Sequence, residues 1–150
     1  MVKLYLDLCC LKRPFDAQDQ PIVRLQTEAL LAILALPADI AHFVRSPAQR
    51  LENSLDPDPA RREAVEVWLA QDLLSAVPEA LVQKRMSGLT ALGFKAFDAF
   101  HLASAELVGA DAFLTVDLPL RKLAHRELSQ LHVRVTDPVR FLEELSEWTH

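Results

Sequence analysis

The sequence predicts an α/β domain in which helices cover both faces of a parallel sheet. Short apolar runs alternate with longer segments that carry an apolar stripe at helical spacing. The connections between these runs are too long for hairpins, so right-handed crossovers are expected to join them. Only 3 of the 150 residues are glycine, which favours helices over tight turns. A chain of this length is expected to form a single domain over residues 1–150.

Short apolar runs bounded by acids, prolines or glycines are the predicted strands. The first, KLYL, is followed by Asp7, and the run at 112–116 is followed by Asp117. The expected strands are residues 3–6, 39–44, 74–77, 112–116 and 132–136. Buried between helices, they give a three-layer α/β/α architecture with a parallel sheet of about five strands.

The predicted helices are residues 22–36, 48–55, 60–73, 79–92, 94–110, 120–128 and 139–148. Their ends follow from residue chemistry. Ser46 suits an N-cap and Pro47 the first helical turn. The sequence DPDP at 56–59 separates two helices because each proline disfavours a helical residue before it. Gly93 and Gly109 stand where C-terminal caps are expected.

The charge of the chain argues against a globally basic nucleic-acid-binding surface, since 16 basic and 21 acidic side chains give a net charge of −5. A local phosphodiester site stays open if carboxylates hold divalent cations and nearby cations hold the phosphates. The candidate flanking cations are Arg45, Arg50, Arg61, Arg62, Lys84, Arg85, Lys95, Arg121 and Lys122.

Compartment and membrane association can also be predicted from composition. No apolar run approaches the roughly 20 residues that span a bilayer, so no membrane association is expected. The cysteines, Cys9 and Cys10, are adjacent and have no other cysteine to pair with, which predicts a reducing, cytoplasmic location. Both are expected to act as small apolar packing residues.

Four acids are predicted to converge on one edge of the sheet. Asp7 and Asp117 follow strands, and the functional crevice of a parallel sheet lies beyond the carboxyl ends of its strands. Asp98 stands in the first turn of a very apolar helix, where a carboxylate is costly unless it is paired or binds a cation. Glu52 lies in the helix that leaves the second strand. The alternatives are turn or N-cap chemistry for the aspartates and solvent exposure for Glu52.

Such a set of oxygen ligands suits Mg²⁺ or Mn²⁺. A cation held there lowers the pKa of a bound water and stabilises a leaving oxygen. Without the metal, the crowded carboxylates repel one another, so at least one of them should bind a proton more readily than a free aspartate does.

Three stretches, YLDLCCLKRPFD, FKAFDAFHLASAELVGADAFLTVD and VRVTDPVRFLEEL, resemble the PIN-domain ribonucleases, a family that includes the toxins of VapBC toxin–antitoxin systems. SPAQRLENSLDPDPARR is similar to the segment around the family's glutamate. The resemblance implies a sheet order of 3-2-1-4-5 and places the family's metal-binding acids on Asp7, Glu52, Asp98 and Asp117. It also implies hydrolysis of RNA, a small antitoxin protein as a partner, and a homodimer.

The resemblance suggests roles for three further residues. Thr115 keeps a hydroxyl near the fourth acid, and Arg13 is expected to order the loop near the site or to contact an RNA phosphate. Leu8 stands where the family commonly has a hydroxyl residue. A catalytically weak PIN-like binding module is therefore an alternative, and a receiver-like phospho-acceptor domain is another.

Three further side chains were assigned to packing rather than to the site. His101 lies one turn after Asp98 and is expected to be a hydrogen-bonded packing residue, with a supporting role behind the acids as the alternative. Trp68 and Trp148 lie on amphipathic segments and are expected in the core or at a partner interface.

Overall fold

A parallel sheet forms the centre of the protein. The computed structural model describes residues 1–72 and 77–149. The strands of the described residues are β1 (Val2–Leu6), β2 (Ala41–Val44), β3 (Ala112–Leu114) and β4 (Arg134–Thr136). They pair in parallel in the order β2-β1-β3-β4, with Leu4 opposite Phe43 on one side and Ala112 on the other. The predicted α/β class with a parallel sheet is confirmed.

The predicted number of strands and the expected order 3-2-1-4-5 are not confirmed. The described residues form 4 strands rather than 5. The run at 74–77 was the remaining prediction, and its residues 74–76 lie outside the described residues.

Helices occupy most of the chain between the strands, and none of the described ones is both long enough and apolar enough to cross a membrane. The longest, α2, has 14 residues. The described helices are α1 (Leu8–Lys12), η1 (Arg13–Phe15), α2 (Pro21–Leu34), α3 (Pro47–Ser54), α4 (Pro59–Leu69), α5 (Glu79–Ala91), α6 (Ala96–Leu107), α7 (Leu118–Arg126), η2 (Leu128–Gln130), α8 (Pro138–Glu143) and α9 (Leu145–Trp148).

The helical boundaries correct the sequence prediction in three places. Residues 8–15 are helical, although no helix was predicted there; LCCLK contains no glycine or proline and can turn directly after the extended Asp7. The predicted final helix is divided at Glu144, whose φ of −103° and ψ of 11° depart from helical values. Of the remaining helix ends, that of α4 lies at Leu69 rather than at residue 73. The capping box of Ser46 and the positive φ of Gly93 and Gly109 confirm the predicted caps.

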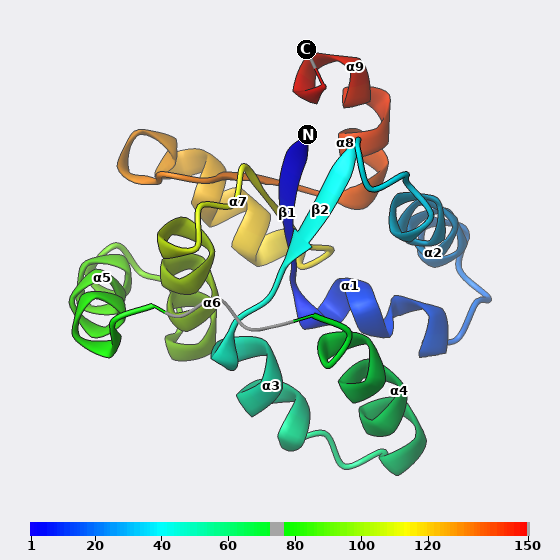
Figure 1. Cartoon of the computed structure of the whole chain (residues 1–150), viewed down its shortest axis with the longest axis horizontal. Coiled ribbons are helices and arrows are strands. Elements are labelled where there is room, and N and C mark those ends of the chain that lie inside the picture. The colour runs from blue at the N-terminus through cyan, green and yellow to red at the C-terminus, as the bar shows by residue number, and fades with distance from the viewer. Residues whose placement is uncertain (73–76, 150) are drawn as a thin grey trace.

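Alternate side chains of the sheet pack into two cores. Leu4 and Leu6 of β1 belong to one core with side chains of α1, α2, α4 and α8. Tyr5 of β1 and Phe113 of β3 belong to the other, with side chains of α5, α6 and α7. Figure 1 shows α5 and α6 on one side of the strands and α1 and α2 on the other. The predicted three-layer arrangement is thereby confirmed for the described residues.

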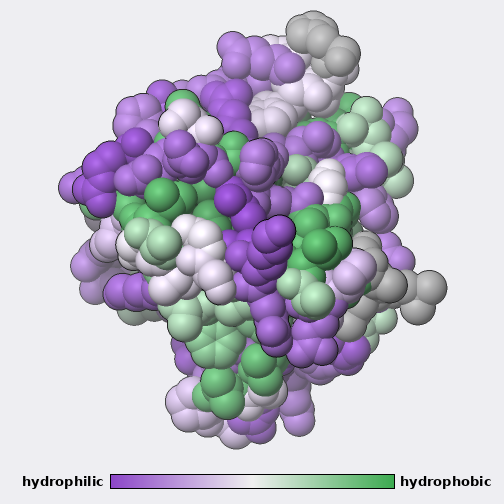
Figure 2. All heavy atoms as spheres, turned by 90° about the vertical axis from the view of Figure 1, so that its left-hand side faces the viewer, coloured by the Kyte–Doolittle hydropathy of each residue, from purple (hydrophilic) through white to green (hydrophobic). Residues whose placement is uncertain are grey.

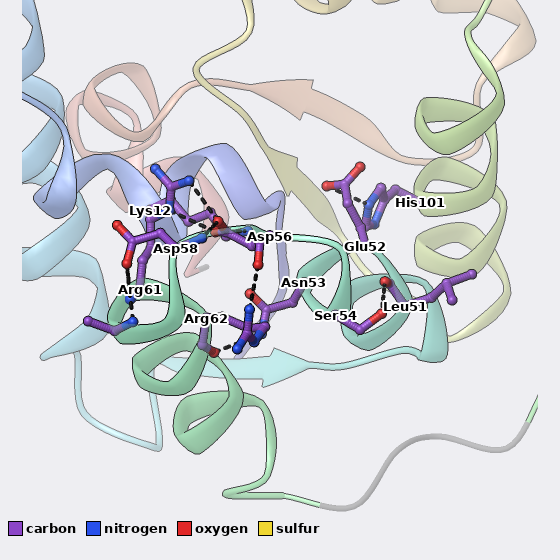
Figure 3. Close-up of polar contacts among 11 residues, drawn as sticks. Lys12, Leu51, Glu52, Asn53, Ser54, Asp56, Asp58, Arg61, Arg62 and His101 are labelled. Atoms are coloured by element: carbon purple, nitrogen blue, oxygen red, sulfur yellow. Dashed lines mark hydrogen bonds and ion pairs between the residues drawn. The ribbon is translucent and has the colours of Figure 1, made fainter.

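An ion-pair cluster around Asp56 joins the end of α1 to the start of α4. The Asp56 side chain is only 2% exposed and accepts from Arg61 Nε at 2.7 Å and from Lys12 Nζ at 2.9 Å. These contacts hold the pKa of Asp56 well below its usual range, and the contact with Arg61 has the largest effect. The cluster lies beside α3, the helix that carries Glu52 (Figure 3). It fixes a segment that the sequence predicted only as a break.

Candidate metal centre

The candidate site lies at the carboxyl ends of β1 and β3. β2 pairs with one edge of β1, and β3, the next strand along the chain, pairs with the other edge. The order in which the chain adds strands to the sheet therefore changes direction at β1. Open α/β sheets place their ligand crevice at such a switch point. Asp7 follows β1, and its backbone N–H donates to Leu114 O of β3 at 2.9 Å.

Asp7 is the most enclosed of the predicted acids, with 7% of its surface exposed. Its Oδ2 accepts from Thr115 Oγ1 at 2.7 Å and from Cys9 Sγ at 3.3 Å. Its side chain makes no capping bond to α1, so the N-cap alternative does not account for this carboxylate. Burial raises the pKa of Asp7, while His101, Thr115 and Cys9 act in the opposite direction. A buried carboxylate held on one oxygen by two donors is an oriented ligand.

Glu52 and His101 lie beside Asp7. Figure 3 shows the two side chains pointing toward each other from α3 and α6. Glu52 Oε1 is 3.4 Å from His101 Nε2, and the imidazole is 1% exposed. One ligand atom from each of Asp7, Glu52 and His101 can be chosen so that all lie within 4.8 Å of one another. Two carboxylates and an imidazole at this spacing fit a divalent cation.

A chain of two hydroxyl groups lies behind the His101 ring, and the first of them contacts the ring. Tyr5 Oη lies 2.7 Å from His101 Nδ1 and 2.7 Å from Ser46 Oγ. Tyr5 is fully buried, and burial raises its pKa well above the usual value, so the phenol keeps its proton. Ser46 is the N-cap of α3 and also sets the start of the helix that carries Glu52. The same serine therefore positions both partners of the Glu52–His101 pair.

Asp98 and Asp117 lie around this group without belonging to its tightest part. Burial and, after it, the charges of Asp7, Asp117 and Glu52 together raise the pKa of Asp98 to about 6, while His101 acts in the opposite direction. Asp117 is exposed, and its Oδ1 accepts from Leu120 N at 3.1 Å as the N-cap of α7. Asp117 therefore does act as an N-cap, which was the alternative to a metal-binding role. Among the described residues, the 4.8 Å group does not include Asp98 or Asp117.

The pKa of Asp98 predicts a pH-dependent stability difference. Its folded-state value of about 6 exceeds the unfolded value of about 3.9, so ionised Asp98 destabilises the fold. That cost is fully present above pH 6 and is relieved as the pH falls toward 4. We expect Asp98→Asn to stabilise the metal-free protein at pH 7 by about 1–2 kcal/mol after allowance for solvent screening, and to lose this gain at pH 4. Urea unfolding in EDTA at both pH values measures it; an equal gain at pH 4 contradicts it.

Cys9 has a role that the sequence prediction missed. Its Sγ lies 3.2 Å from Thr115 Oγ1 and 3.3 Å from Asp7 Oδ2, and it accepts from Val116 N at 3.4 Å. The packing assignment was therefore wrong for Cys9 but is confirmed for Cys10, which is fully buried in the core. Leu8 also belongs to that core. The polar group beside Asp7 is thus the thiol of residue 9 rather than a side chain at residue 8.

Arg13 orders the loop that follows α1, which was one of the two roles predicted for it. Its Nε donates to Gln26 Oε1 at 2.9 Å and its Nη1 to Asp16 Oδ2 at 3.0 Å. These bonds connect the 3₁₀ turn after α1 to α2. Its contact with RNA stays a prediction.

A pocket of about 400 Å³ opens next to Asp98 and Asp117. Lys95, Lys122 and Arg126 also line it. All three cations are exposed, and none of them forms an ion pair with another described residue. An acidic group bordered by available cations has the charge pattern expected for a phosphodiester bound through a metal.

Several other predicted flanking cations are engaged elsewhere. Arg61 binds Asp56, and Arg85 binds Glu106. Arg45 stacks on Trp68 with its guanidinium carbon 3.9 Å from the ring centre. Trp68 and Trp148 pack against the core, as predicted.

The fold and the site together define a class: an α/β protein with a group of acidic side chains and a histidine at the carboxyl edge of a parallel sheet. Comparison of the chain with models of known families, with curated proteins and with solved structures finds no match. The function is therefore argued from the residues of this group.

Proposed function

We propose that the protein is a divalent-metal-dependent ribonuclease that hydrolyses RNA phosphodiester bonds. The observation that supports the proposal is a group of acids at the switch point of the sheet, where Asp7 and Glu52 lie close together and Asp98 and Asp117 line one pocket. Clustered carboxylates of this kind are ligands for Mg²⁺ or Mn²⁺. The adjacent cationic pocket supports a substrate with several phosphates.

Each part of the site has a task in this reaction. Asp7 and Glu52 would hold the cation, which supplies a water of lowered pKa and stabilises charge on the leaving 3′-oxygen. Thr115 keeps Asp7 oriented through the 2.7 Å bond to Oδ2. Asp98, half-buried beside this group, would accept a proton from the attacking water. Lys95 and Lys122 would hold phosphates next to the scissile one.

The proposal also specifies the kind of ribonuclease. The motifs that resemble the PIN domain favour a toxin of the VapBC type, with a small antitoxin protein as partner and a homodimer as the assembly. A five-stranded sheet in the family's order 3-2-1-4-5 is also part of the proposal, and the described strands have the order β2-β1-β3-β4. Exposed apolar side chains such as Leu81 of α5 and Leu107 of α6 are available for protein contacts. Figure 2 shows apolar patches between hydrophilic ones on the side of the molecule that carries these helices.

Cleavage of a labelled single-stranded RNA tests the proposal. The wild-type protein is expected to cut it in Mg²⁺ or Mn²⁺ and not in EDTA, and to leave a 5′-phosphate. Asp98→Asn should reduce the rate by about 10²–10⁴-fold, the range for removal of a general base. Asp39→Asn is the matched control, because Asp39 is exposed and precedes the amino end of β2, at the opposite edge of the sheet. Equal cleavage by Asp98→Asn and wild type, or cleavage that persists in EDTA, overturns the proposal.

A further inference from the structure

We propose that Nε2 of His101 is a metal ligand together with the carboxylates of Asp7 and Glu52, and that the site therefore prefers a first-row transition-metal ion to Mg²⁺. The inference rests on the metal site of the proposed function and adds a nitrogen ligand to it. Four acids alone would form a site of oxygen ligands only. The added nitrogen ligand changes which metal ion the site prefers.

The spacing of the three side chains is close to that of ligands on one ion. Metal–ligand bonds of about 2.0–2.2 Å place two ligands of the same ion about 2.8–4.4 Å apart. The Glu52 Oε1 to His101 Nε2 distance of 3.4 Å lies inside this range. All three ligand atoms lie within 4.8 Å of one another, so a small movement of the half-buried Glu52 side chain would bring them to the spacing of ligands on one ion.

His101 Nε2 is a buried polar atom that lacks a hydrogen-bond partner among the described residues. The ring is 1% exposed, so water does not replace that partner at the surface. A buried nitrogen without a partner is unfavourable, because it has lost its hydrogen bonds to water. The atom faces the Glu52 carboxylate, with Asp7 in the same group. A cation bound between the three would satisfy Nε2 through its lone pair.

The opposite side of the ring is built to keep that lone pair available. When Nδ1 carries the proton, it donates to Tyr5 Oη at 2.7 Å, and Tyr5 donates to Ser46 Oγ at 2.7 Å. Metal-binding histidines usually donate their other N–H in this way, which fixes both tautomer and ring orientation.

The ligand set determines which cation is favoured. Mg²⁺ prefers oxygen ligands and retains several waters, whereas imidazole nitrogen suits ions such as Zn²⁺, Fe²⁺ and Ni²⁺. Affinity at a mixed nitrogen and oxygen site rises from Mn²⁺ through Fe²⁺ to Co²⁺. Removal of the imidazole should thus weaken Mn²⁺ and Co²⁺ binding much more than Mg²⁺ binding.

Pulsed electron paramagnetic resonance of Mn²⁺ bound to the metal-depleted full-length protein tests the assignment. A ligating imidazole couples its ¹⁴N nucleus to the Mn²⁺ spin, so the wild type is expected to show nitrogen modulation and His101→Gln to lose it. Calorimetry should give at least about a tenfold loss of Mn²⁺ affinity for His101→Gln, with less than a threefold change for Mg²⁺. His42→Gln, which changes an exposed histidine on β2, should behave as the wild type.

Tyr5→Phe provides a second variant that leaves the imidazole in place. It removes the hydroxyl behind His101 and is expected to weaken Mn²⁺ binding by about 10–100-fold while nitrogen modulation persists in the bound state. If the wild type shows no nitrogen modulation, the assignment is wrong whether or not the variants fold. Equal losses of Mg²⁺ and Mn²⁺ affinity in a folded His101→Gln protein also overturn it.

RNA cleavage separates this inference from the proposed function. Nitrogen modulation in a protein that does not cut RNA supports the metal site and overturns the nuclease. Metal-dependent cleavage without nitrogen modulation supports the nuclease and overturns the role of His101.

Discussion

Asp7→Asn is expected to reduce metal-dependent RNA cleavage by well over 10²-fold and to weaken Mn²⁺ binding by a similar factor. Loss of a partner behind a metal ligand already costs about 10–100-fold, so loss of a charged ligand should cost more. Asp7 is the acid on which Thr115 and Cys9 converge and the one closest to full burial. Asparagine keeps the shape of the side chain and can still accept from Thr115, so the change removes chiefly the charge.

The stability of this variant distinguishes a lost ligand from a lost fold. Burial raises the pKa of Asp7, which means that its charge opposes folding in the metal-free protein at neutral pH. Asp7→Asn should therefore unfold in EDTA at a temperature equal to or above that of the wild type. Mn²⁺ at 100 times its dissociation constant should stabilise the wild type by about 2.7 kcal/mol and the variant hardly at all.

Differential scanning calorimetry with and without Mn²⁺ measures both effects. Asp111→Asn is a suitable control, since Asp111 precedes the amino end of β3, at the opposite edge of the same sheet. The prediction is contradicted if Mn²⁺ raises the unfolding temperature of Asp7→Asn as much as that of the wild type.

The acids at the strand ends could be predicted because chain direction alone places them. Parallel strands put their carboxyl ends on one edge, so an acid directly after β1 and another soon after β3 must lie near each other, whatever the side-chain packing. Their different environments could not be predicted in this way. Asp7 is enclosed by Thr115 and Cys9, while Asp117 turns outward to cap α7, and that difference depends on how α1 and α7 leave the sheet.

The role of His101 could not be recognised from sequence because it depends on contacts across the fold. Its spacing from Asp98 places both on adjacent turns of α6, a weak signal that also fits ordinary packing. The direction of the ring is set by Tyr5 of β1 and by Ser46 before α3, which are 96 and 55 residues away along the chain. Cys9 is similar, because only the approach of β3 brings Thr115 to the thiol.

Reversing three charges next to the acids is expected to produce the largest loss of RNA binding. The triple change Lys95→Glu, Lys122→Glu and Arg126→Glu replaces the cations of the pocket beside Asp98 and Asp117. Each phosphate contact to a single strand contributes about 0.7 to the slope of log affinity against log salt concentration. If these three cations contact phosphates, the slope should fall by about 2, and affinity at low salt should fall by at least about 10²-fold.

Filter binding of a labelled RNA across a salt series can measure this, with Asp98→Asn as the common background so that the RNA stays intact. The triple change Lys3→Glu, Arg24→Glu and Arg140→Glu is the matched control, because it alters the net charge equally at exposed positions outside the pocket. A loss that depends on total charge would appear in both triples. A loss confined to the pocket triple would place the RNA backbone beside the acids, whereas equal salt slopes in both triples would exclude the pocket as the phosphate-binding surface.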